Sequence, residues 1–314
     1  METIAAAQNV GRTSWPILGR IGIAVFWCAA IVLGPGERAF AGTPDTLHLD
    51  VFVGEADSWD VMSTLIYGKS EAILVDSQFR ISQAKKLSDL VVATDHYIGT
   101  AVLHKRFPET PIYMTADALE EFKRTSGTAL NAKKASAPSE TPDSMPTPEA
   151  LPTTILTVDG EAVAVIKDFQ GDVLKTANSF RWIPSLRAVV AGDTVFNGVH
   201  VWRGDSTLES RRAWLDSLQL IVALRPRVVV AGHKRNPGVP DSPRAVTSME
   251  KYLHDFESAR KASSSADELV AIMKRKCPDW SQERLLVSSA KAAFLRAANT
   301  ASDRSLPAGS TSKQ

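Results

Sequence analysis

Cysteine is nearly absent from this chain of 314 residues, which contains only Cys28 and Cys277. Cys28 lies in an N-terminal apolar run that we predict to be removed, which would leave Cys277 without a partner. An intramolecular disulfide framework is therefore excluded for the mature chain. Cys277 also lies far in the sequence from the candidate site segments described below, so we expect a passive thiol rather than a nucleophile.

An excess of charge of one sign is also lacking. The chain has 36 Lys and Arg against 35 Asp and Glu, a net charge of +1, and no block of basic residues. Nucleic-acid binding relies on a concentrated basic surface, so we do not expect nucleic acid as a partner. With 44% hydrophobic residues, the chain can bury a sizeable core in one domain or in two fused halves.

The N-terminus has no apolar run of the ~20 residues that a membrane span needs. The uncharged run 21–33 is shorter, follows Arg12 and Arg20, and precedes Ala39-Phe40-Ala41. A basic flank, a short apolar run and an A-x-A site predict a secretory signal peptide at 1–41, cleaved after Ala41. The mature protein is then expected to be secreted or periplasmic, with no membrane attachment. The alternative is an uncleaved membrane anchor.

Short apolar segments and helical periodicities alternate along the mature chain. Strands are predicted at 47–53, 63–67, 71–75, 111–115, 154–158, 162–166, 179–183, 188–190 and 227–231. Helices are predicted at 81–90, 99–107, 116–124, 206–224 with Ser206 as its cap, 243–260, 265–275 and 281–298. Two strand-rich halves with helices between and after them predict a layered α/β arrangement.

These elements predict three regions after the signal. We expect a main α/β domain at 42–240, a helical extension at 241–298, and a polar, disordered tail at 299–314. Within the main domain, residues 125–152 are rich in Ser, Thr, Ala and Pro, which predicts a long loop. Such a loop is either a solvated linker or a flap over a site, and the sequence leaves both open.

Polar residues that could bind a ligand or take part in catalysis follow apolar or mixed segments at four places. They are Asp95-His96, Gly171-Asp172, Gly192-Asp193 and Gly232-His233. Open α/β sheets build sites from such groups at their strand ends. Each pattern alone also has a simpler explanation, because an Asp often caps a helix, Gly-Asp often forms a turn, and a histidine after glycine can lie in a solvated loop. His200 and Trp202 could line a substrate pocket or lie in a surface loop.

Taken together in this order, the segments resemble the metallo-β-lactamase superfamily from about Leu47 to Lys234. An early hairpin followed by Ala72-Ile-Leu-Val-Asp76 extends the resemblance. The resemblance implies a four-layer αββα sandwich, here with extra C-terminal helices, that binds one or two metal ions, usually zinc, between its sheets.

The chain departs from the family pattern before Asp95. The family signature is H-x-H-x-D-H, but this chain has Val91 and Ala93 where the two preceding histidines would fall. The predicted helix at 81–90 also runs almost directly into Asp95, with little room for a strand that would carry the motif. The sequence therefore lacks a segment here, through a true deletion or an error in the gene model. Asp172 stands where the family has another histidine, and it could ligate zinc through oxygen.

The resemblance implies a specific ligand set and reaction. Four residues match the ligands of one of the family's two metals: Asp95, His96, Asp193 and His233. We therefore expect one zinc ion rather than two, with Asp172 as a weak further ligand. The implied function is hydrolysis of a lactam, lactone or other ester- or amide-like bond in a small molecule by a metal-activated water, which Asp95 would orient or deprotonate. The alternative is a binding protein that kept the fold and lost the metals.

Overall fold

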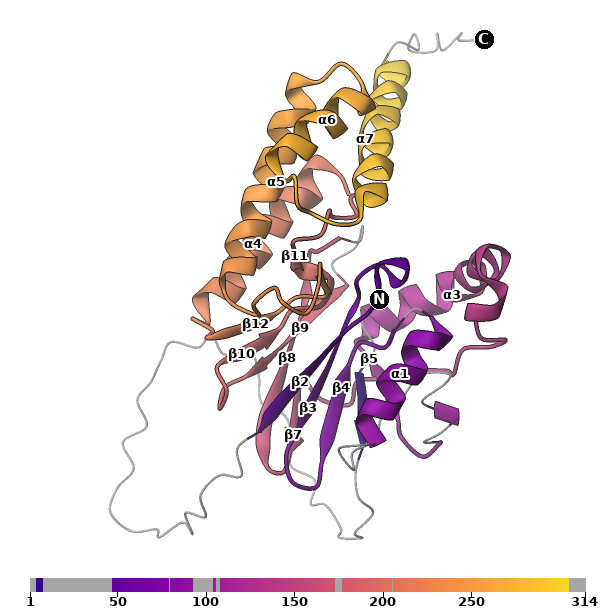
Figure 1. Cartoon of the computed structure of the whole chain (residues 1–314), viewed down its shortest axis with the longest axis vertical. Coiled ribbons are helices and arrows are strands. Elements are labelled where there is room, and N and C mark those ends of the chain that lie inside the picture. The colour runs from indigo at the N-terminus through magenta and orange to yellow at the C-terminus, as the bar shows by residue number, and fades with distance from the viewer. Residues whose placement is uncertain are drawn as a thin grey trace, which may run out of the picture.

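The computed structural model of this chain describes residues 4–7, 47–78, 80–92, 104–105, 108–172, 177–204 and 206–304. Two β-sheets face each other, and helices cover the outer side of each (Figure 1). This order of helix, sheet, sheet and helix confirms the predicted αββα sandwich. The predicted helix at 99–107 lies largely outside the described residues.

The first sheet has six strands in the order β2-β3-β4-β1-β5-β6. Their bounds are β1 Ile4–Ala7, β2 His48–Val53, β3 Met62–Tyr67, β4 Ala72–Val75, β5 Ile112–Met114 and β6 Glu149–Ala150. Strand β1 comes from the predicted signal region and pairs antiparallel with both β4 and β5. The place between β4 and β5 is thus taken by a segment from the start of the chain. Helices α1 (Ile81–Val92) and α3 (Ala116–Ser136) lie on the outer side (Figure 1).

The second sheet has five strands in the order β12-β10-β9-β8-β7. Their bounds are β7 Ile155–Val158, β8 Glu161–Phe169, β9 Asn178–Ile183, β10 Ala188–Val190 and β12 Val228–Val230. β10 and β12 run parallel, whereas the other neighbours are antiparallel. Helices α4 (Leu208–Ala223) and α5 (Arg244–Ala262) lie on its outer side (Figure 1). A short parallel pair, β11 (Phe196–Asn197) and β13 (His233–Lys234), follows these strands.

Apolar side chains fill the spaces on both sides of the second sheet. Between the sheets lie residues of both, including Met62, Ile66, Ile73, Val163, Val165, Ile183 and Val190. Between the second sheet and the helices lie Phe180, Val189, Trp214, Leu218, Tyr252 and Phe256, among others. A strand covered on both faces has no solvated side, which explains why β10 and β12 are apolar at every position.

Helix α3 corrects the prediction of a loop over 125–152. The helix continues to Ser136, well beyond the predicted end at residue 124. Its second half contains alanines and lysines, which favour helix, and this preference outweighs the Ser and Thr residues that suggested a loop. The helix stops just before Pro138, as expected because the residue before a proline avoids helical backbone angles. Only the part from residue 137 onward remains a candidate linker or flap.

Helices α5, α6 (Ala266–Lys276) and α7 (Glu283–Arg304) lie in the region where the sequence predicts a helical extension. They gather beyond one end of the sandwich (Figure 1). Helix α7 continues past the predicted boundary at residue 298 to Arg304. The cap of helix α4 is Thr207, one residue after the predicted cap Ser206, which instead donates to the Arg203 carbonyl at 3.0 Å. None of the helices in the described ranges has the length and apolar character of a membrane span.

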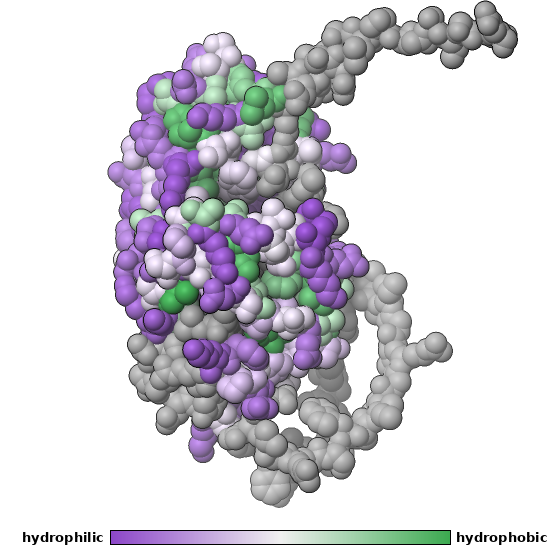
Figure 2. All heavy atoms as spheres, turned by 90° about the vertical axis from the view of Figure 1, so that its right-hand side faces the viewer, coloured by the Kyte–Doolittle hydropathy of each residue, from purple (hydrophilic) through white to green (hydrophobic). Residues whose placement is uncertain are grey.

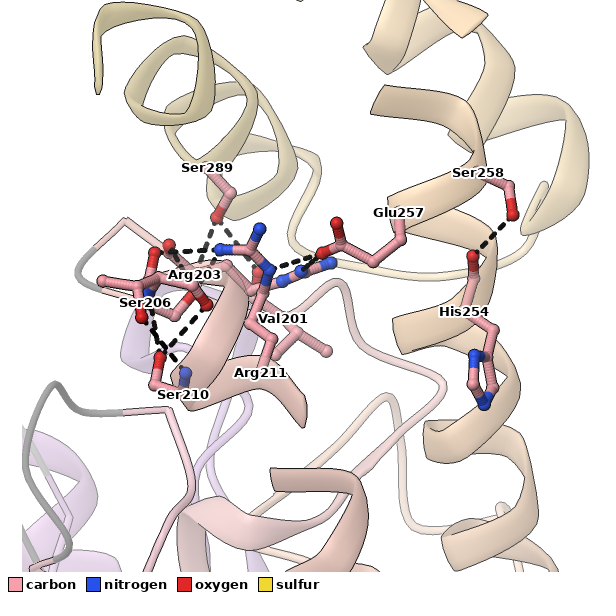
Figure 3. Close-up of polar contacts among 10 residues, drawn as sticks. Val201, Arg203, Ser206, Ser210, Arg211, His254, Glu257, Ser258 and Ser289 are labelled. Carbon is pink, nitrogen blue, oxygen red and sulfur yellow. Dashed lines mark hydrogen bonds and ion pairs between the residues drawn. The ribbon is translucent and has the colours of Figure 1, made fainter. Parts of the chain in front are cut away.

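A buried ionic cluster connects α4, α5 and the loop before α4 (Figure 3). The Arg203 side chain, 1% exposed, donates from Nη2 to Glu257 Oε1 at 2.6 Å, and Arg211 also donates to that oxygen. The Arg203 guanidinium lies 3.8 Å from the centroid of the Phe256 ring. Ser289 of α7 accepts from the Arg203 backbone N–H at 2.8 Å, so this cluster also reaches the last helix.

The face of the molecule seen in Figure 2 carries hydrophilic residues across its described part, with hydrophobic residues between them in small groups. The large hydrophobic side chains that are exposed come from several separate elements: Met145, Ile155, Leu208, Leu220, Val222 and Leu295. Scattered exposed apolar residues of this kind are normal for a globular protein and indicate no particular partner.

Candidate metal centre

Asp193 and His233 come together at the ends of two neighbouring strands. Asp193 lies in the short turn η3 (Gly192–Thr194) after β10, and His233 begins β13 after β12. β10 and β12 are parallel neighbours, so their carboxyl ends meet at the same edge of the sheet. His233 Nε2 lies 3.1 Å from Asp193 Oδ1. The sequence prediction of a site at these strand ends therefore has a geometric basis in this pair.

The His233 ring is held on three sides. It stacks on Phe196, its neighbour across the β11–β13 pair, with ring centroids 4.6 Å apart and planes within 3°. Its Nδ1 lies 2.7 Å from the Trp59 carbonyl oxygen, and its Nε2 faces Asp193. A carbonyl and a carboxylate can only accept hydrogen bonds, so both ring nitrogens face acceptors. A positive charge is therefore needed here, either as a second ring proton or as a metal ion on Nε2.

The pKa values of the pair follow from this geometry. Burial alone would lower the pKa of His233, but the hydrogen bond to Asp193 and its negative charge raise it above its usual value. Burial alone would also raise the pKa of Asp193, but the hydrogen bond from His233 holds it well below its usual range. Both shifts favour the ionised pair, with Asp193 negative and His233 positive.

Asp172 is the third acidic or basic group of this region. It follows β8, is 9% exposed, and accepts from Asn178 Nδ2 at 3.4 Å. Burial, together with the negative charge of Asp193, raises the pKa of Asp172 to about 7. A buried carboxylate (Asp172) and a half-buried one (Asp193) near one imidazole leave negative charge without full compensation when both are ionised, which favours binding of a cation.

The donors of this pair fit zinc. Zinc binds carboxylate oxygen and imidazole nitrogen at about 2.0–2.2 Å, and two such bonds can span the 3.1 Å between His233 Nε2 and Asp193 Oδ1. In the part of the chain that the structure describes, there is no group of three or more His, Cys, Asp or Glu residues close enough to hold a metal ion. The other two predicted ligands, Asp95 and His96, lie outside the described residues. Only Ala93 and Thr94 separate Asp95 from the end of α1.

His200 and Trp202 lie near the C-terminal extension. His200 is 1% exposed, and its Nδ1 lies 3.1 Å from the Tyr252 hydroxyl. The Tyr252 ring stacks on Trp280 at 4.8 Å, with His200 against both. The Trp202 ring packs over Gly204, where an added Cβ would lie 2.3 Å from it. This geometry favours a packing role for His200, while substrate binding by Trp202 stays a prediction.

The buried state of His200 makes stability depend on pH. Burial lowers the pKa of His200 from 6.5 to about 4. Between these values the unfolded chain binds a proton that the native chain does not, so the free energy of unfolding falls as the pH drops from 6.5 to 4. At ~1.4 kcal/mol per pKa unit, the loss from this residue is about 3 kcal/mol. Replacing it by Gln should remove that loss.

Urea unfolding of wild type and His200→Gln at several pH values measures this loss. The difference in the free energy of unfolding between wild type and His200→Gln should become smaller toward pH 4 and stay constant above pH 7. His254, exposed on α5, provides the control His254→Gln, which should run parallel to wild type. Parallel curves for His200→Gln as well would show that its burial does not affect the titration.

Sequence patterns did not reveal the groups that hold His233 in place. The Trp59 carbonyl is a backbone group in a turn with positive φ angles. The residue types in this segment do not predict such a turn. Phe196 could have been found, because it lies in the apolar segment after Asp193 and takes the place opposite His233 once β11 and β13 pair. Short parallel pairs of this kind have too few residues to give a recognisable period.

Comparisons with known proteins bear on this geometry. The family model described as the metallo-beta-lactamase superfamily matches residues 94–233, which include Asp95, His96, Asp172, Asp193 and His233. The match begins where the sequence departs from the family's signature. A search of curated proteins gives no match.

Several solved structures are similar to this chain. A metallo-beta-lactamase family protein from Thermus thermophilus superposes with a TM-score of 0.50 at 14% identity, covering 81% of this chain and 94% of its own. A beta-lactamase domain protein from Burkholderia ambifaria has a TM-score of 0.41 at 18% identity, covering 60% of this chain and 59% of its own. A metallo-beta-lactamase from Pontibacter korlensis has a TM-score of 0.35 at 13% identity, covering 66% of this chain and 100% of its own.

The Thermus thermophilus structure supports the fold, because at this identity a structural likeness shows the fold and not the activity. The superposition agrees with the arrangement of two facing sheets with helices on their outer sides. The family model adds the residues at the strand ends, and the structure brings Asp193 and His233 of that match into contact. Residues 94–233 thus match the model of the metallo-beta-lactamase superfamily, and the chain has the fold of that superfamily's solved structures.

Proposed function

We propose that this protein is an exported, metal-dependent hydrolase that cleaves a lactam, lactone or other ester- or amide-like bond in a small molecule. The observation that carries the proposal is the placement of His233. Its Nδ1 faces the Trp59 carbonyl and its Nε2 faces Asp193, so Nε2 is directed at a position where a cation is needed. Metal-binding histidines commonly donate their other ring nitrogen to a carbonyl in this way.

The residues divide into three roles. Asp193 and His233 would hold zinc, the metal that members of the superfamily typically bind, and Asp95 and His96 would complete the set of four ligands. When bound, zinc supplies a water of lowered pKa and polarises the substrate carbonyl. Asp95 would orient this water or take up its proton. Asp172, at a pKa of about 7, stays a weak candidate ligand.

The position in the cell and the partners belong to the same proposal. The basic flank, the short apolar run and Ala39-Phe40-Ala41 support export, with a mature chain that starts at Gly42. Cleavage there would also remove β1 from between β4 and β5, so the mass of the exported protein decides between a cleaved chain and one that keeps this strand. The balanced charge supports a small-molecule substrate rather than nucleic acid.

Metal analysis of the purified full chain tests the proposed function. After dialysis against zinc, we expect about one zinc ion per chain, since four ligands suit a single tetrahedral ion. Asp193→Asn and His233→Gln should each lower the zinc content more than tenfold, because each removes one ligand. Hydrolysis of p-nitrophenyl acetate or of a chromogenic cephalosporin should require the zinc and stop when a chelator removes it.

His254→Gln is the matched control, because it removes an exposed histidine on α5 and should leave the zinc content unchanged. Circular dichroism establishes that each variant is folded. A folded wild-type chain that takes up no zinc would overturn the proposal, as would zinc that stays bound in both site variants.

A second candidate function is a non-catalytic binding protein with the same fold. Two observations favour it: the signature positions before Asp95 hold Val91 and Ala93, and the described residues contain no group of three metal-binding side chains. A folded, metal-free wild-type chain is the expected result under this alternative, so the same zinc measurement separates the two.

A further inference from the structure

The loop that carries the Trp59 carbonyl has an unusual backbone. Trp59 and Asp60 follow the short helix η1 (Ala56–Ser58), with φ angles of 66° and 56°. Two consecutive residues other than glycine in the left-handed region are costly, so the surroundings must hold them there. The carbonyl between them contacts His233 Nδ1 at 2.7 Å. What holds this turn therefore also sets the position of the His233 ring.

The side chain of Asp60 connects the turn to the C-terminal extension. Asp60 is 3% exposed, and its Oδ2 accepts from Ser281 Oγ at 2.7 Å and from Gln282 Nε2 at 2.9 Å. Both partners immediately precede α7. On the other side, the Asp60 carbonyl accepts from the backbone N–H of Lys234 at 3.0 Å, and Val61 forms a β-bridge with His233. Asp60 thus lies between the extension and the strand that carries His233.

Further contacts hold the rest of the loop to the same segment. Gln282 Nε2 also donates to the Ala56 carbonyl at 2.7 Å, and Arg284 Nη2 donates to that carbonyl at 2.9 Å. The Arg284 guanidinium lies 3.6 Å from the centroid of the Trp59 ring. The segment 281–284 therefore holds η1 at its start and the Trp59–Asp60 turn at its end.

We propose that Asp60 is a positioning residue for the metal centre: through it, the C-terminal extension holds the Trp59 carbonyl against His233 Nδ1 and so directs Nε2 at the metal. Asp60 touches neither metal nor substrate, so its effect passes through the Trp59–His233 hydrogen bond. The consequence for metal binding rests on the proposed function, whereas the consequence for the His233 ring does not. Partners that orient a metal-binding histidine in other proteins change metal affinity ~10–100-fold when removed.

Three variants of the full chain separate positioning from a general loss of structure. Asp60→Gly removes the carboxylate while glycine tolerates the positive φ. Asp60→Asn keeps the shape and the ability to accept, and Asn tolerates this backbone better than most residues. Ser281→Ala removes one donor from the other side, so the same contact is tested even if Asp60→Gly fails to fold. The control is Glu283→Gln, which lies in the same segment and forms an exposed ion pair with Lys274.

Two readouts are needed. The first is the NMR signal of the His233 Nδ1–H proton in the metal-free chain, which the hydrogen bond to the Trp59 carbonyl should protect from exchange with water. The second is the dissociation constant of zinc, measured by competition with a chromogenic chelator. We expect Asp60→Gly to lose the protected signal and to weaken zinc binding about tenfold. Ser281→Ala should weaken it less, Asp60→Asn should restore most of it, and Glu283→Gln should behave as wild type.

The outcomes distinguish this inference from the proposed function. If no variant binds zinc but the Nδ1–H signal still depends on Asp60, the proposed function fails and the positioning role stands. If folded Asp60→Gly and Ser281→Ala keep both the protected signal and the zinc affinity of wild type, Asp60 does not position His233. Absence of a protected signal in the wild-type chain would also overturn the inference.

Discussion

Gly232→Ala is expected to abolish zinc binding and to lower the free energy of unfolding by about 3 kcal/mol or more. An added Cβ at Gly232 would lie 2.4 Å from Gly192 C, 2.5 Å from Gly192 O and 2.8 Å from Asp193 N. All three are backbone atoms, so no side chain can rotate away to make room. The turn η3 would have to move away from the end of β12.

The displacement reaches the metal centre directly, because the same close approach carries hydrogen bonds. Gly232 N–H donates to the Gly192 and Val195 carbonyls at 3.0 Å each, and the Gly232 carbonyl accepts from Met62 N–H at 2.8 Å. Asp193 lies in the displaced turn and His233 follows Gly232 in sequence. The methyl group would thus separate the two proposed ligands, whose side chains lie 3.1 Å apart.

Urea unfolding and zinc content of the purified variant measure both effects. Gly127→Ala is the matched control: it lies within α3, and an added Cβ there meets nothing within 4 Å. That substitution should stabilise the protein by about 0.5–1 kcal/mol, because alanine favours helix over glycine. Gly232→Ala with the stability and zinc content of wild type would show that the strand ends are not as closely packed as the structure indicates.

The sequence could predict the place of this site but not its details. Apolar strands that end in Gly-Asp and Gly-His predicted that Asp193 and His233 lie at strand ends, and the parallel pairing of β10 and β12 explains why they meet. The pattern works because a strand buried on both faces stays apolar until it leaves the sheet. The polar residue that follows therefore marks the edge where sites form.

Contacts between distant segments could not be predicted in this way. Asp60 and Gln282 are far apart in the sequence, and neither belongs to a period or a motif that would pair them. The prediction of a loop at 125–152 was wrong for a different reason. Its composition suggested a linker, but helix preference and the cap at Thr115 continued α3 to Ser136. Once a helix has formed, adding further residues to it is favourable, and this outweighed the loop-like composition of the segment.

The position between β4 and β5 bears on the predicted missing segment before Asp95. The sequence predicted that helix 81–90 leaves no room for a strand to deliver the motif, and α1 indeed continues to Val92. The sheet nevertheless has a place between β4 and β5, which Ile4–Ala7 takes in antiparallel pairing with both neighbours. Without a strand in this position, the facing edges of β4 and β5 would have unpaired backbone N–H and C=O groups. The pairing therefore agrees with the interpretation that the sequence lacks a strand before Asp95.

Glu257→Ala is expected to lower the free energy of unfolding by about 3–5 kcal/mol. Glu257 Oε1 accepts from both Arg203 and Arg211, and the Arg203 side chain is almost fully buried. Burial lowers the pKa of Arg203 to about 10, so the guanidinium still carries its charge at neutral pH. Removal of Glu257 would leave that charge in the interior without its partner, which costs far more than the loss of an exposed ion pair.

A second substitution can establish that the loss comes from the uncompensated charge. Adding Arg203→Met to Glu257→Ala removes the buried cation and keeps an apolar group against Phe256, so the double variant should regain part of the lost stability. Glu283→Ala, which breaks the exposed pair with Lys274, should cost less than about 1 kcal/mol. Urea unfolding of the four proteins at neutral pH measures these differences. A Glu257→Ala loss as small as that of Glu283→Ala, or a double variant less stable than Glu257→Ala, would mean that this ion pair does not hold α5 to the loop before α4.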